Sequence, residues 1–263
     1  MLDITIGLVS WKARNLLQQC LDSLEASLDG LSREVWVVDN DSGDGTLEML
    51  RERYPTVAVI ENSINRGVAP ARNQIISRAR GKYLIFLDVD TRMLPGSLRI
   101  LAQVMDQYPE VAIGGPKLLY GDGTLQLSCR PFPSPLNILI EGTFLRDYFS
   151  DNRFVKEYTM EEWGHGELRE VDWMYGACLI IRHSVLDRLG HFDEGFFYLY
   201  EDIDLCFRAK KLGMKVLYIP QAEVIHYLER ERKSIFHPRI RVHIRSILRY
   251  LRKDYYGYLW RTG

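Results

Sequence analysis

The sequence lacks the features of several common protein classes. No window holds the roughly 18 uninterrupted apolar residues of a membrane-spanning helix. Residues 1–11 contain an acidic residue and a short apolar run, where a signal peptide has a basic start and an apolar core. We therefore expect a cytoplasmic protein, at most peripheral at the inner face of a membrane. The cysteines form no CxxC pair, which suits reduced thiols better than a disulfide framework or a zinc site: Cys20, Cys129, Cys178 and Cys206.

Glycine-rich phosphate loops are missing too. The first strand-like run is followed by Ser10-Trp11-Lys12-Ala13-Arg14, which contains no glycine. A dinucleotide oxidoreductase needs a GxGxxG motif at this point, and a sugar-nucleotide nucleotidyltransferase needs a glycine-rich loop that carries Lys or Arg. The sequence therefore argues against both of these classes of nucleotide-binding enzyme.

The chain does contain enough apolar side chains for a sizeable core, together with an uneven charge. Of its 263 residues, 46% are hydrophobic and 26% are charged. Residues 228–263 hold ten Lys or Arg and three acidic residues, a net charge of +7, so residues 1–227 carry −8 of the total of −1. No base-reading motif accompanies the basic tail, so we expect no nucleic-acid partner.

A basic amphipathic helix is predicted in this tail, over residues 239–253. One helical stripe is apolar and another is basic: Ile240, Ile244, Ile247, Leu248 and Leu251 against Arg241, Arg245, Arg249 and Arg252. Tyrosines and a tryptophan follow in residues 255–260. Such a segment either lies on an anionic membrane surface through residues 239–260 or docks its apolar stripe on the body of the protein. The sequence leaves both interpretations open.

The first half of the chain alternates strand-like and helix-like patterns. Apolar, β-branched runs at 4–9, 35–38, 57–60 and 83–87 are separated by segments with apolar residues at helical spacing. This order predicts an α/β fold with a mostly parallel sheet covered on both faces, which binds its ligand beyond the carboxyl ends of the strands. After Pro116 the alternation fades, and we expect short helices and loops over 129–173, strands at 177–182, 215–219 and 222–226, and a helix at 202–212.

Two carboxylates follow the predicted strand at 83–87. In a strand, residues i and i+2 project to the same side, so Asp88 and Asp90 can converge on one centre while Val89 packs inward. Carboxylate oxygens suit Mg²⁺ or Mn²⁺. The alternative is a solvated strand end, since a lone DxD pattern is frequent by chance. His226, at another predicted strand end, is either a further metal ligand or a hydrogen-bonded histidine.

A second pair of carboxylates, Glu201 and Asp202, begins a predicted helix. Acidic side chains there can simply stabilise the helix N-terminus. The aromatic run at 196–200 directly before them instead favours a walled pocket, in which a partly desolvated aspartate serves as a general base. Arg66 and Arg72, near the start of another predicted helix, could bind phosphate or form a solvated pair on the surface.

Taken in order, these motifs resemble the family 2 glycosyltransferases, which are inverting nucleotide-sugar enzymes of the GT-A fold. The resemblance covers about residues 3–227 and is nearest to the rhamnosyltransferase-like enzymes of bacterial surface polysaccharide synthesis. It implies a Rossmann-like, mostly parallel central sheet flanked by helices, with an acceptor-side region and the C-terminal basic helix. The matching runs are V-S-W at 9–11, V-D-N-D-S-x-D-G-T at 38–46, N-x-G-x-x-x-x-R-N at 65–73, L-D-x-D at 87–90, G-A-C-L-x-I-R at 176–182, F-D-E-x-F-F-x-x-x-E-D-x-D-L-x-x-R at 192–208 and P-x-A-x-V-x-H at 220–226.

The resemblance implies a role for each matching residue. The donor-binding residues would be Val9, Ser10, Asp39, Asn65, Gly67, Arg72, Asn73 and Asp88. Asp90 would bind a Mg²⁺ or Mn²⁺ ion, with His226 completing its shell. Asp202 would be the general base, and Glu201 would help to hold it and the acceptor. The residues that face the acceptor would be Trp173, Gly176 and Ala177.

The implied reaction is a single displacement with inversion, from a dTDP-rhamnose-like donor or a UDP-sugar to a hydroxyl of a glycan or lipid-linked acceptor. The chain lacks the Gln-x-x-Arg-Trp run of processive synthases, so one sugar is transferred per encounter. Residues 1–227 would form the GT-A domain, with a nucleotide-binding half (1–115) and an acceptor and catalytic half (116–227), and 228–263 a basic helical extension. The alternatives are a nucleotidyltransferase and an inactive nucleotide-sugar-binding protein; Asp90 and Asp202 argue against the second.

Overall fold

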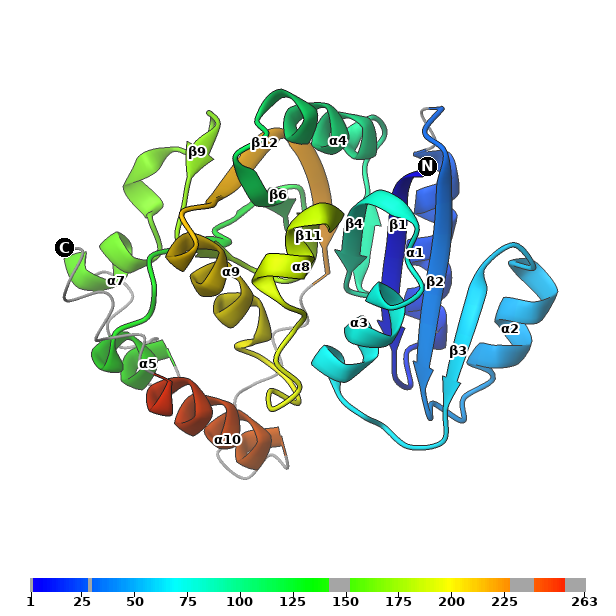
Figure 1. Ribbon diagram of the computed structural model, residues 1–263. Coiled ribbons are helices and arrows are strands. Elements are labelled where there is room, and N and C mark those ends of the chain that lie inside the picture. The colour runs from blue at the N-terminus through cyan, green and yellow to red at the C-terminus, as the bar shows by residue number, and fades with distance from the viewer. Residues whose placement is uncertain (1, 28–29, 142–151, 228–238, 254–263) are drawn as a thin grey trace.

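The computed structural model describes residues 2–27, 30–141, 152–227 and 239–253. These residues form a ten-stranded sheet in the order β3-β2-β1-β4-β11-β6-β12-β5, with β7 paired to β6 and β9 paired to β12 (Figure 1). The N-terminal half of the sheet is parallel, and its strands are β1 (Leu2–Ser10), β2 (Arg33–Asn40), β3 (Ala58–Asn62) and β4 (Gly81–Leu87). Its helices are α1 (Arg14–Ala26), α2 (Thr46–Arg53) and α3 (Val68–Ile76). The predicted α/β fold with a largely parallel sheet is confirmed.

The C-terminal half of the sheet mixes directions. β11 (Cys178–Arg182) lies antiparallel between β4 and β6 (Val111–Leu119), and β12 (Lys215–His226) runs parallel to β6. β5 (Thr91–Met93) is antiparallel to β12. The short strands are β7 (Leu125–Gln126), β9 (Arg169–Glu170) and a separate pair, β8 (Cys129–Arg130) with β10 (Trp173–Met174). The remaining helices are α4 (Ser97–Gln107), α5 (Pro135–Glu141), α7 (Arg153–Tyr158), α8 (Leu186–Leu189), α9 (Glu201–Lys211) and α10 (Arg239–Arg252), with 3₁₀ turns at Glu161–Trp163 and His183–Val185.

Both faces of the sheet are covered, which explains why β4 is apolar throughout. Leu84 and Phe86 belong to a buried cluster on the side of α3 and α9, whereas Tyr83, Ile85 and Leu87 belong to a second cluster on the side of α1 and α4. Successive side chains of a strand point to opposite faces, so a central strand must be apolar at every position. The four cysteines, all within the described residues, are buried and unpaired, as expected.

Several elements differ from the sequence prediction. The two strands expected at 215–219 and 222–226 are one strand, β12, whose register against β6 shifts between Ile219 and Glu223. The break therefore marks an irregularity within one strand, at Pro220. β6 and α4 were not predicted. In β6, Gly114, Gly115 and Pro116 interrupt the apolar pattern, although all three are buried in the sheet.

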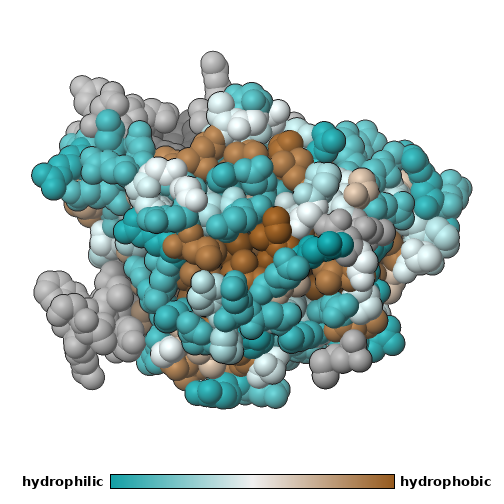
Figure 2. All heavy atoms as spheres, turned by 90° about the horizontal axis from the view of Figure 1, so that it is seen from above, coloured by the Kyte–Doolittle hydropathy of each residue, from teal (hydrophilic) through white to brown (hydrophobic). Residues whose placement is uncertain are grey.

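The surface seen from the side of α4 is mostly hydrophilic, with apolar side chains gathered near its middle (Figure 2). No helix in the described parts of the chain is long and apolar enough to cross a membrane. The predicted C-terminal helix is present as α10, which lies beside α5 at the end of the molecule remote from α4 (Figure 1). The predicted aromatic segment at 255–260 falls outside the described residues.

Candidate active site

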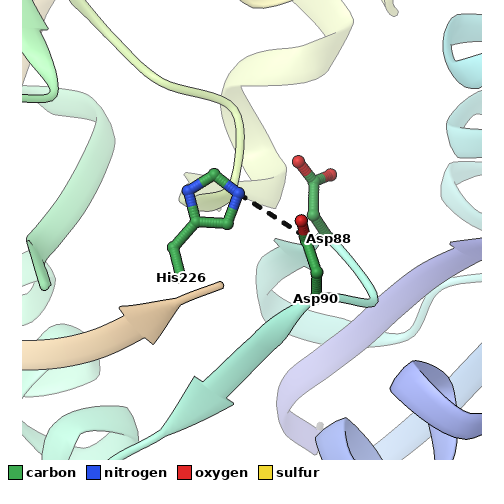
Figure 3. A group of neighbouring side chains, drawn as sticks. All are labelled: Asp88, Asp90 and His226. Atoms are coloured by element: carbon green, nitrogen blue, oxygen red, sulfur yellow. Dashed lines mark ion pairs between the residues drawn. The ribbon is translucent and has the colours of Figure 1, made fainter. Parts of the chain in front are cut away.

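Asp88, Asp90 and His226 form a cluster whose ligand atoms all lie within 4.8 Å of one another (Figure 3). Beyond the end of β4, the backbone N–H of Asp88 donates to the carbonyl of Ala177 at 2.9 Å, and the Thr91 hydroxyl closes a turn on the Asp88 carbonyl at 2.7 Å. The chain then enters β5, in which Thr91 lies opposite His226 of β12. Strand pairing therefore brings the DxD pair and the histidine together from distant parts of the sequence.

The environment of His226 favours metal ligation. Its Nδ1 lies 2.8 Å from Oε1 of Gln126, which is an acceptor, so Nδ1 carries a hydrogen, and Nε2 faces Asp90 Oδ1 at 3.5 Å, where a proton on Nε2 pairs with the carboxylate. Burial alone would lower the pKa of His226, but the hydrogen bond to Asp90 and the charges of Asp90 and Asp88 raise it above its ordinary value. Two carboxylates and one imidazole fit a divalent cation, which would replace that proton.

The carboxylates of Glu201 and Asp202 lie in the first turn of α9, preceded by two residues with positive φ, Leu199 (64°) and Tyr200 (72°). Oδ2 of Asp202 accepts a hydrogen bond from the backbone N–H of Gly176 at 2.9 Å, and Oδ1 accepts one from Ile203 at 2.8 Å. The hydrogen bond from Ile203 stabilises the start of α9, which agrees with the interpretation that acidic side chains there stabilise the helix N-terminus. The hydrogen bond from Gly176 has a second effect, because it holds the Asp202 carboxylate against the segment that leads into β11.

Burial dominates the protonation of this pair. It raises the pKa of Glu201 to about 7, with a further contribution from the negative charge of Asp202, while Arg72 opposes the shift. Burial also raises the pKa of Asp202, against the hydrogen bond from Ile203 and the charge of Arg72. The Oε2 atom of Glu201 is buried and has no hydrogen-bond partner among the described residues. Titratable carboxylates of this kind are typical of general acids and bases.

Arg72 connects the two groups of carboxylates. It is 3% exposed, so it is not part of a solvated surface pair, and its contact with a donor stays a prediction. Its guanidinium donates to Asp88 Oδ1 at 3.1 Å, to Glu201 Oε1 at 3.4 Å and to the carbonyl of Gly176 at 3.0 Å. The same group lies 5.6 Å and 5.4 Å from the ring centres of Phe86 and Phe192. The aromatic rings hold the cation in place, and its donors set the spacing of the acids.

The three residues expected near the acceptor have different surroundings. At Gly176 an added Cβ would lie 3.1 Å from Asp202 Oδ2 and 3.3 Å from a nitrogen of Arg72, so the glycine permits the close approach of both. Ala177 is buried and contacts Asp88 through its carbonyl. Trp173 is 7% exposed and donates its indole N–H to the carbonyl of Pro131 at 2.9 Å. Contact of these three residues with an acceptor stays a prediction.

The carboxyl ends of β1 and β2 bring Ser10 opposite Asp39. Both side chains are buried, and within the described residues Ser10 Oγ and Asp39 Oδ1 have no hydrogen-bond partner. Asp39 Oδ2 accepts the backbone N–H of Ser42 at 3.2 Å. Val9, just before Ser10, is partly exposed. Buried polar atoms without partners are costly, so this pair is suited to a ligand that supplies both hydrogen bonds.

The segment from Asn65 to Asn73 packs against the loop that precedes α9. Gly67 has φ +88°, and a Cβ there would lie 2.5 Å from the carbonyl oxygen of Phe197, so only glycine fits. Asn65 Oδ1 accepts the N–H of Gly67 at 2.9 Å. Asn73 donates to the Phe192 carbonyl at 2.9 Å and accepts from its N–H at 3.0 Å. In this structure Asn65, Gly67 and Asn73 shape the loop, and their contact with a donor stays a prediction.

Residues 5–166 match the family described as Glycosyl transferase family 2. The chain belongs to this family. A second family model, Glycosyl transferase family group 2, matches residues 135–262. The Mycobacterium tuberculosis protein N-acetylglucosaminyl-diphospho-decaprenol L-rhamnosyltransferase is 31% identical over 207 residues, which cover 73% of this chain and 66% of that protein. The rhamnosyltransferase WbbL of Escherichia coli is 40% identical over 81 residues, 31% of each chain. The resemblance to rhamnosyltransferase-like members of the family is confirmed.

Solved structures of this family's fold are similar over nearly the whole chain. GalNAc-T7, determined with UDP, GalNAc and Mn²⁺, has a TM-score of 0.66 at 15% identity and covers 94% of this chain and 48% of its own. The mannosyltransferase PcManGT of Pyrobaculum calidifontis, in complex with GDP-Man and Mn²⁺, has a TM-score of 0.61 at 19% identity and covers 96% of this chain and 67% of its own. At these identities the likeness shows the fold alone, which confirms the predicted GT-A architecture.

Gln126 and the full set of Arg72 contacts were missed by sequence reasoning. Gln126 lies on the two-residue strand β7, after a turn, and no local pattern singles it out. Arg72 belonged to a recognised motif, but its sequence neighbours gave no sign that Phe86, Phe192 and Gly176 would enclose it. Both cases depend on contacts between residues far apart in the chain.

Proposed function

We propose that this protein is an inverting glycosyltransferase that moves one sugar from a nucleotide-diphosphate sugar to a hydroxyl of a glycan or lipid-linked acceptor in surface polysaccharide synthesis. The observation that carries the proposal is the junction made by Arg72, which contacts both Asp88 of the candidate metal cluster and Glu201 of the carboxylate pair. A cation-binding centre beside a partly buried base is the arrangement that this reaction requires.

The donor would lie along the carboxyl ends of β1, β2 and β4. Asp39 would accept a hydrogen bond from the nucleobase, Val9 and Ser10 would line the base and ribose, and Asp88 would contact the ribose side. The unpartnered Ser10 Oγ and Asp39 Oδ1, among the described residues, support a polar ligand at this position. The name of the mycobacterial relative favours rhamnose as the transferred sugar. We propose a dTDP-rhamnose-like donor, with a UDP-sugar as the second candidate. That relative's name also favours a lipid-linked acceptor.

Asp90 and His226 would hold Mg²⁺ or Mn²⁺, and Asp88 lies close enough to join them. When bound, the ion would supply electrostatic stabilisation for the negative charge of the leaving diphosphate. His226 is held for this role by Gln126, which keeps the hydrogen on Nδ1.

Asp202 would be the general base. Each of its carboxylate oxygens accepts one backbone hydrogen bond, and the side chain stays partly exposed, so it is oriented and still accessible to an acceptor hydroxyl. It would take the hydroxyl proton while the acceptor oxygen bonds to the anomeric carbon, and the bond from that carbon to the diphosphate would break with its electrons leaving on oxygen. Attack from the face opposite the diphosphate inverts the centre and needs no covalent intermediate.

The same proposal includes the division of the chain and its location. Residues 1–115 would bind the nucleotide, 116–227 would supply the acceptor side and the base, and 228–263 would form the basic extension.

We place the protein in the cytoplasm, at the inner face of the membrane. The support is an apolar stripe on α10, where Ile244, Leu248 and Leu251 are 49%, 47% and 38% exposed and Arg245 and Arg252 are exposed beside them.

Calorimetric titration of dTDP, UDP and GDP, with and without Mn²⁺, tests the donor and metal assignments. We expect tight binding only with the metal, dTDP as the preferred ligand, and a loss of at least tenfold in metal-dependent affinity in Asp90→Ala. Asp187→Ala is a matched control, because Asp187 is an exposed acid of α8 outside the site. If none of the three nucleotides binds in a metal-dependent way, the proposed donor site is wrong.

No observation favours the alternatives. The loop after β1, Ser10 to Arg14, contains no glycine, unlike a nucleotidyltransferase phosphate loop. An inactive binding protein would have no need of Asp202, whose carboxylate is held by two backbone hydrogen bonds beside the cluster.

A further inference from the structure

The helix α10 docks on the loop that leads to the catalytic carboxylates. This loop, residues 192–200, joins α8 to Glu201 and Asp202 at the start of α9. The hydroxyl of Ser246 donates to the carbonyl of Tyr198 at 2.8 Å. Tyr250 is fully buried, with its ring centre 5.2 Å from that of Tyr200. The docked side of α10 therefore includes Ser246 and Tyr250, and the exposed Ile244, Leu248 and Leu251 lie on another side.

Charge complementarity strengthens this contact at both ends of the loop. Arg249 binds both carboxylate oxygens of Asp193, at 3.1 Å and 2.6 Å, and Lys253 also pairs with Asp193. Burial alone would raise the pKa of Asp193, but these hydrogen bonds hold it well below its usual range. Lys253 also donates to Asp204, a fully buried acid in the first turn of α9, at 2.5 Å. Arg249 of α10 and Lys253, the residue just after this helix, thus hold acids on either side of Glu201 and Asp202 in the sequence.

The loop itself is in a conformation that its neighbours must maintain. Leu199 and Tyr200 both have positive φ, 64° and 72°, which is unfavourable for residues other than glycine. Such a backbone persists only where surrounding contacts over-determine it. Ser246 and Tyr250 contact the residues at this point, so α10 is the element that supplies part of the constraint.

The opposite side of the loop is fixed by the donor half. Asn73 makes hydrogen bonds with the backbone of Phe192, and the N–H of Val68 donates to the carbonyl of Phe197 at 2.8 Å. Arg249 packs over the ring of Phe196, with 5.5 Å between its guanidinium and the ring centre. The loop is therefore held between α3 on one side and α10 on the other, and the carboxylates follow directly from it.

We propose that α10 is a positioning element for the transfer reaction, and that the Arg249 and Lys253 contacts to Asp193 and Asp204 fix the geometry of Glu201 and Asp202. This inference rests on the proposed function, since it assumes that Asp202 acts as the base. Neither Arg249 nor Lys253 touches the reacting atoms in this assignment. Their effect passes through the loop and the first turn of α9.

The test compares Arg249→Ala, Arg249→Lys and Asp193→Asn with the wild-type full chain. Arg51→Ala is the matched control, because Arg51 also pairs with a carboxylate, Glu61, at 3.7 Å but on a remote exposed surface. We expect kcat to fall on the order of tenfold or more in Arg249→Ala and Asp193→Asn, with the KM for donor and the metal-dependent dTDP affinity changed less than twofold. Arg249→Lys should recover part of kcat.

Hydrogen–deuterium exchange of peptides spanning 193–204 gives a readout that does not depend on turnover. We expect faster exchange there in Arg249→Ala and Asp193→Asn, and wild-type exchange in Arg51→Ala. A wild-type kcat in both variants, or a fall in kcat with no change in exchange at 193–204, would contradict the positioning role. If the wild-type chain transfers no sugar, the proposed function fails instead, and the exchange data still decide whether α10 holds the loop.

Discussion

Burial at single residues sets the charge of the candidate base. Asp202 and Glu201 are adjacent acids, and burial raises the pKa of both. They differ in hydrogen bonding, because each oxygen of Asp202 accepts a short backbone N–H bond, whereas Glu201 Oε1 accepts a longer one from Arg72 at 3.4 Å and Oε2 accepts none from the described residues. Hydrogen bonds to a carboxylate favour its charged form. We therefore expect Asp202 to lose its proton before Glu201, whose pKa burial and the charge of Asp202 raise to about 7.

This difference predicts the pH dependence of transfer. A carboxyl with a pKa of about 7 is neutral below that pH and charged above it, and the new charge beside Asp202 makes Asp202 a stronger base. We expect kcat/KM to keep rising through pH 7 in the wild type. In Glu201→Gln this rise should be absent, and the plateau should be reached at lower pH. Initial rates from pH 5 to pH 9 give the pH profile of kcat/KM. If Glu201→Gln keeps the inflection near pH 7, a group other than Glu201 is responsible for it.

At the scale of elements, α10 presents two distinct surfaces. One side is docked through Ser246, Tyr250, Arg249 and Lys253. The other exposes an apolar stripe with arginines beside it. From the sequence, the apolar stripe of this helix could either dock on the body of the protein or lie on a membrane. The structure shows that docking uses polar and aromatic residues together with Ile247 of the stripe, which packs against a buried cluster. Ile244, Leu248 and Leu251 remain on the surface.

Vesicle binding tests this exposed side. Leu248→Asp should reduce sedimentation with vesicles that contain anionic phosphatidylglycerol by about tenfold or more, because it removes an exposed apolar side chain that would enter the membrane and adds a negative charge. Leu212→Asp is the control, since Leu212 is 41% exposed, similar to Leu248, but lies at the end of α9. Equal binding of the Leu248→Asp chain, or equal binding of the wild type to neutral phosphatidylcholine vesicles, would contradict membrane contact through α10.

The elements that could be predicted from sequence are those with a strong local pattern. β1, β2, β3 and β4 follow uninterrupted apolar runs, and α9 follows regular helical spacing. β6 contains two glycines and Pro116, and its burial depends on β11 and β12 on either side. β5 has three residues, yet its pairing with β12 places His226 beside Asp90. The motifs therefore named the site residues, while non-local strand pairing determined how those residues meet.

At the scale of the whole molecule, the candidate site lies at the junction of a parallel and a mixed half of one sheet. The parallel half brings Ser10, Asp39 and Asp88 to the carboxyl ends of its strands. The mixed half contributes Gly176 ahead of β11, Asp202 of α9 and His226 of β12. Arg72 extends from the first half to Glu201 of the second. The central claim is that these halves hold a donor and a base, respectively, for one displacement.

Single-turnover transfer by Asp202→Asn, measured alongside metal-dependent binding of the nucleotide diphosphate, tests that claim most directly. The asparagine keeps the size of the side chain but is not a base. We predict that transfer falls on the order of 10²–10⁴-fold, while the affinity for the nucleotide diphosphate with Mn²⁺ stays within about twofold of the wild type, because the base lies outside the donor site. Wild-type turnover in Asp202→Asn would contradict the assignment of the base and, with it, the proposed mechanism.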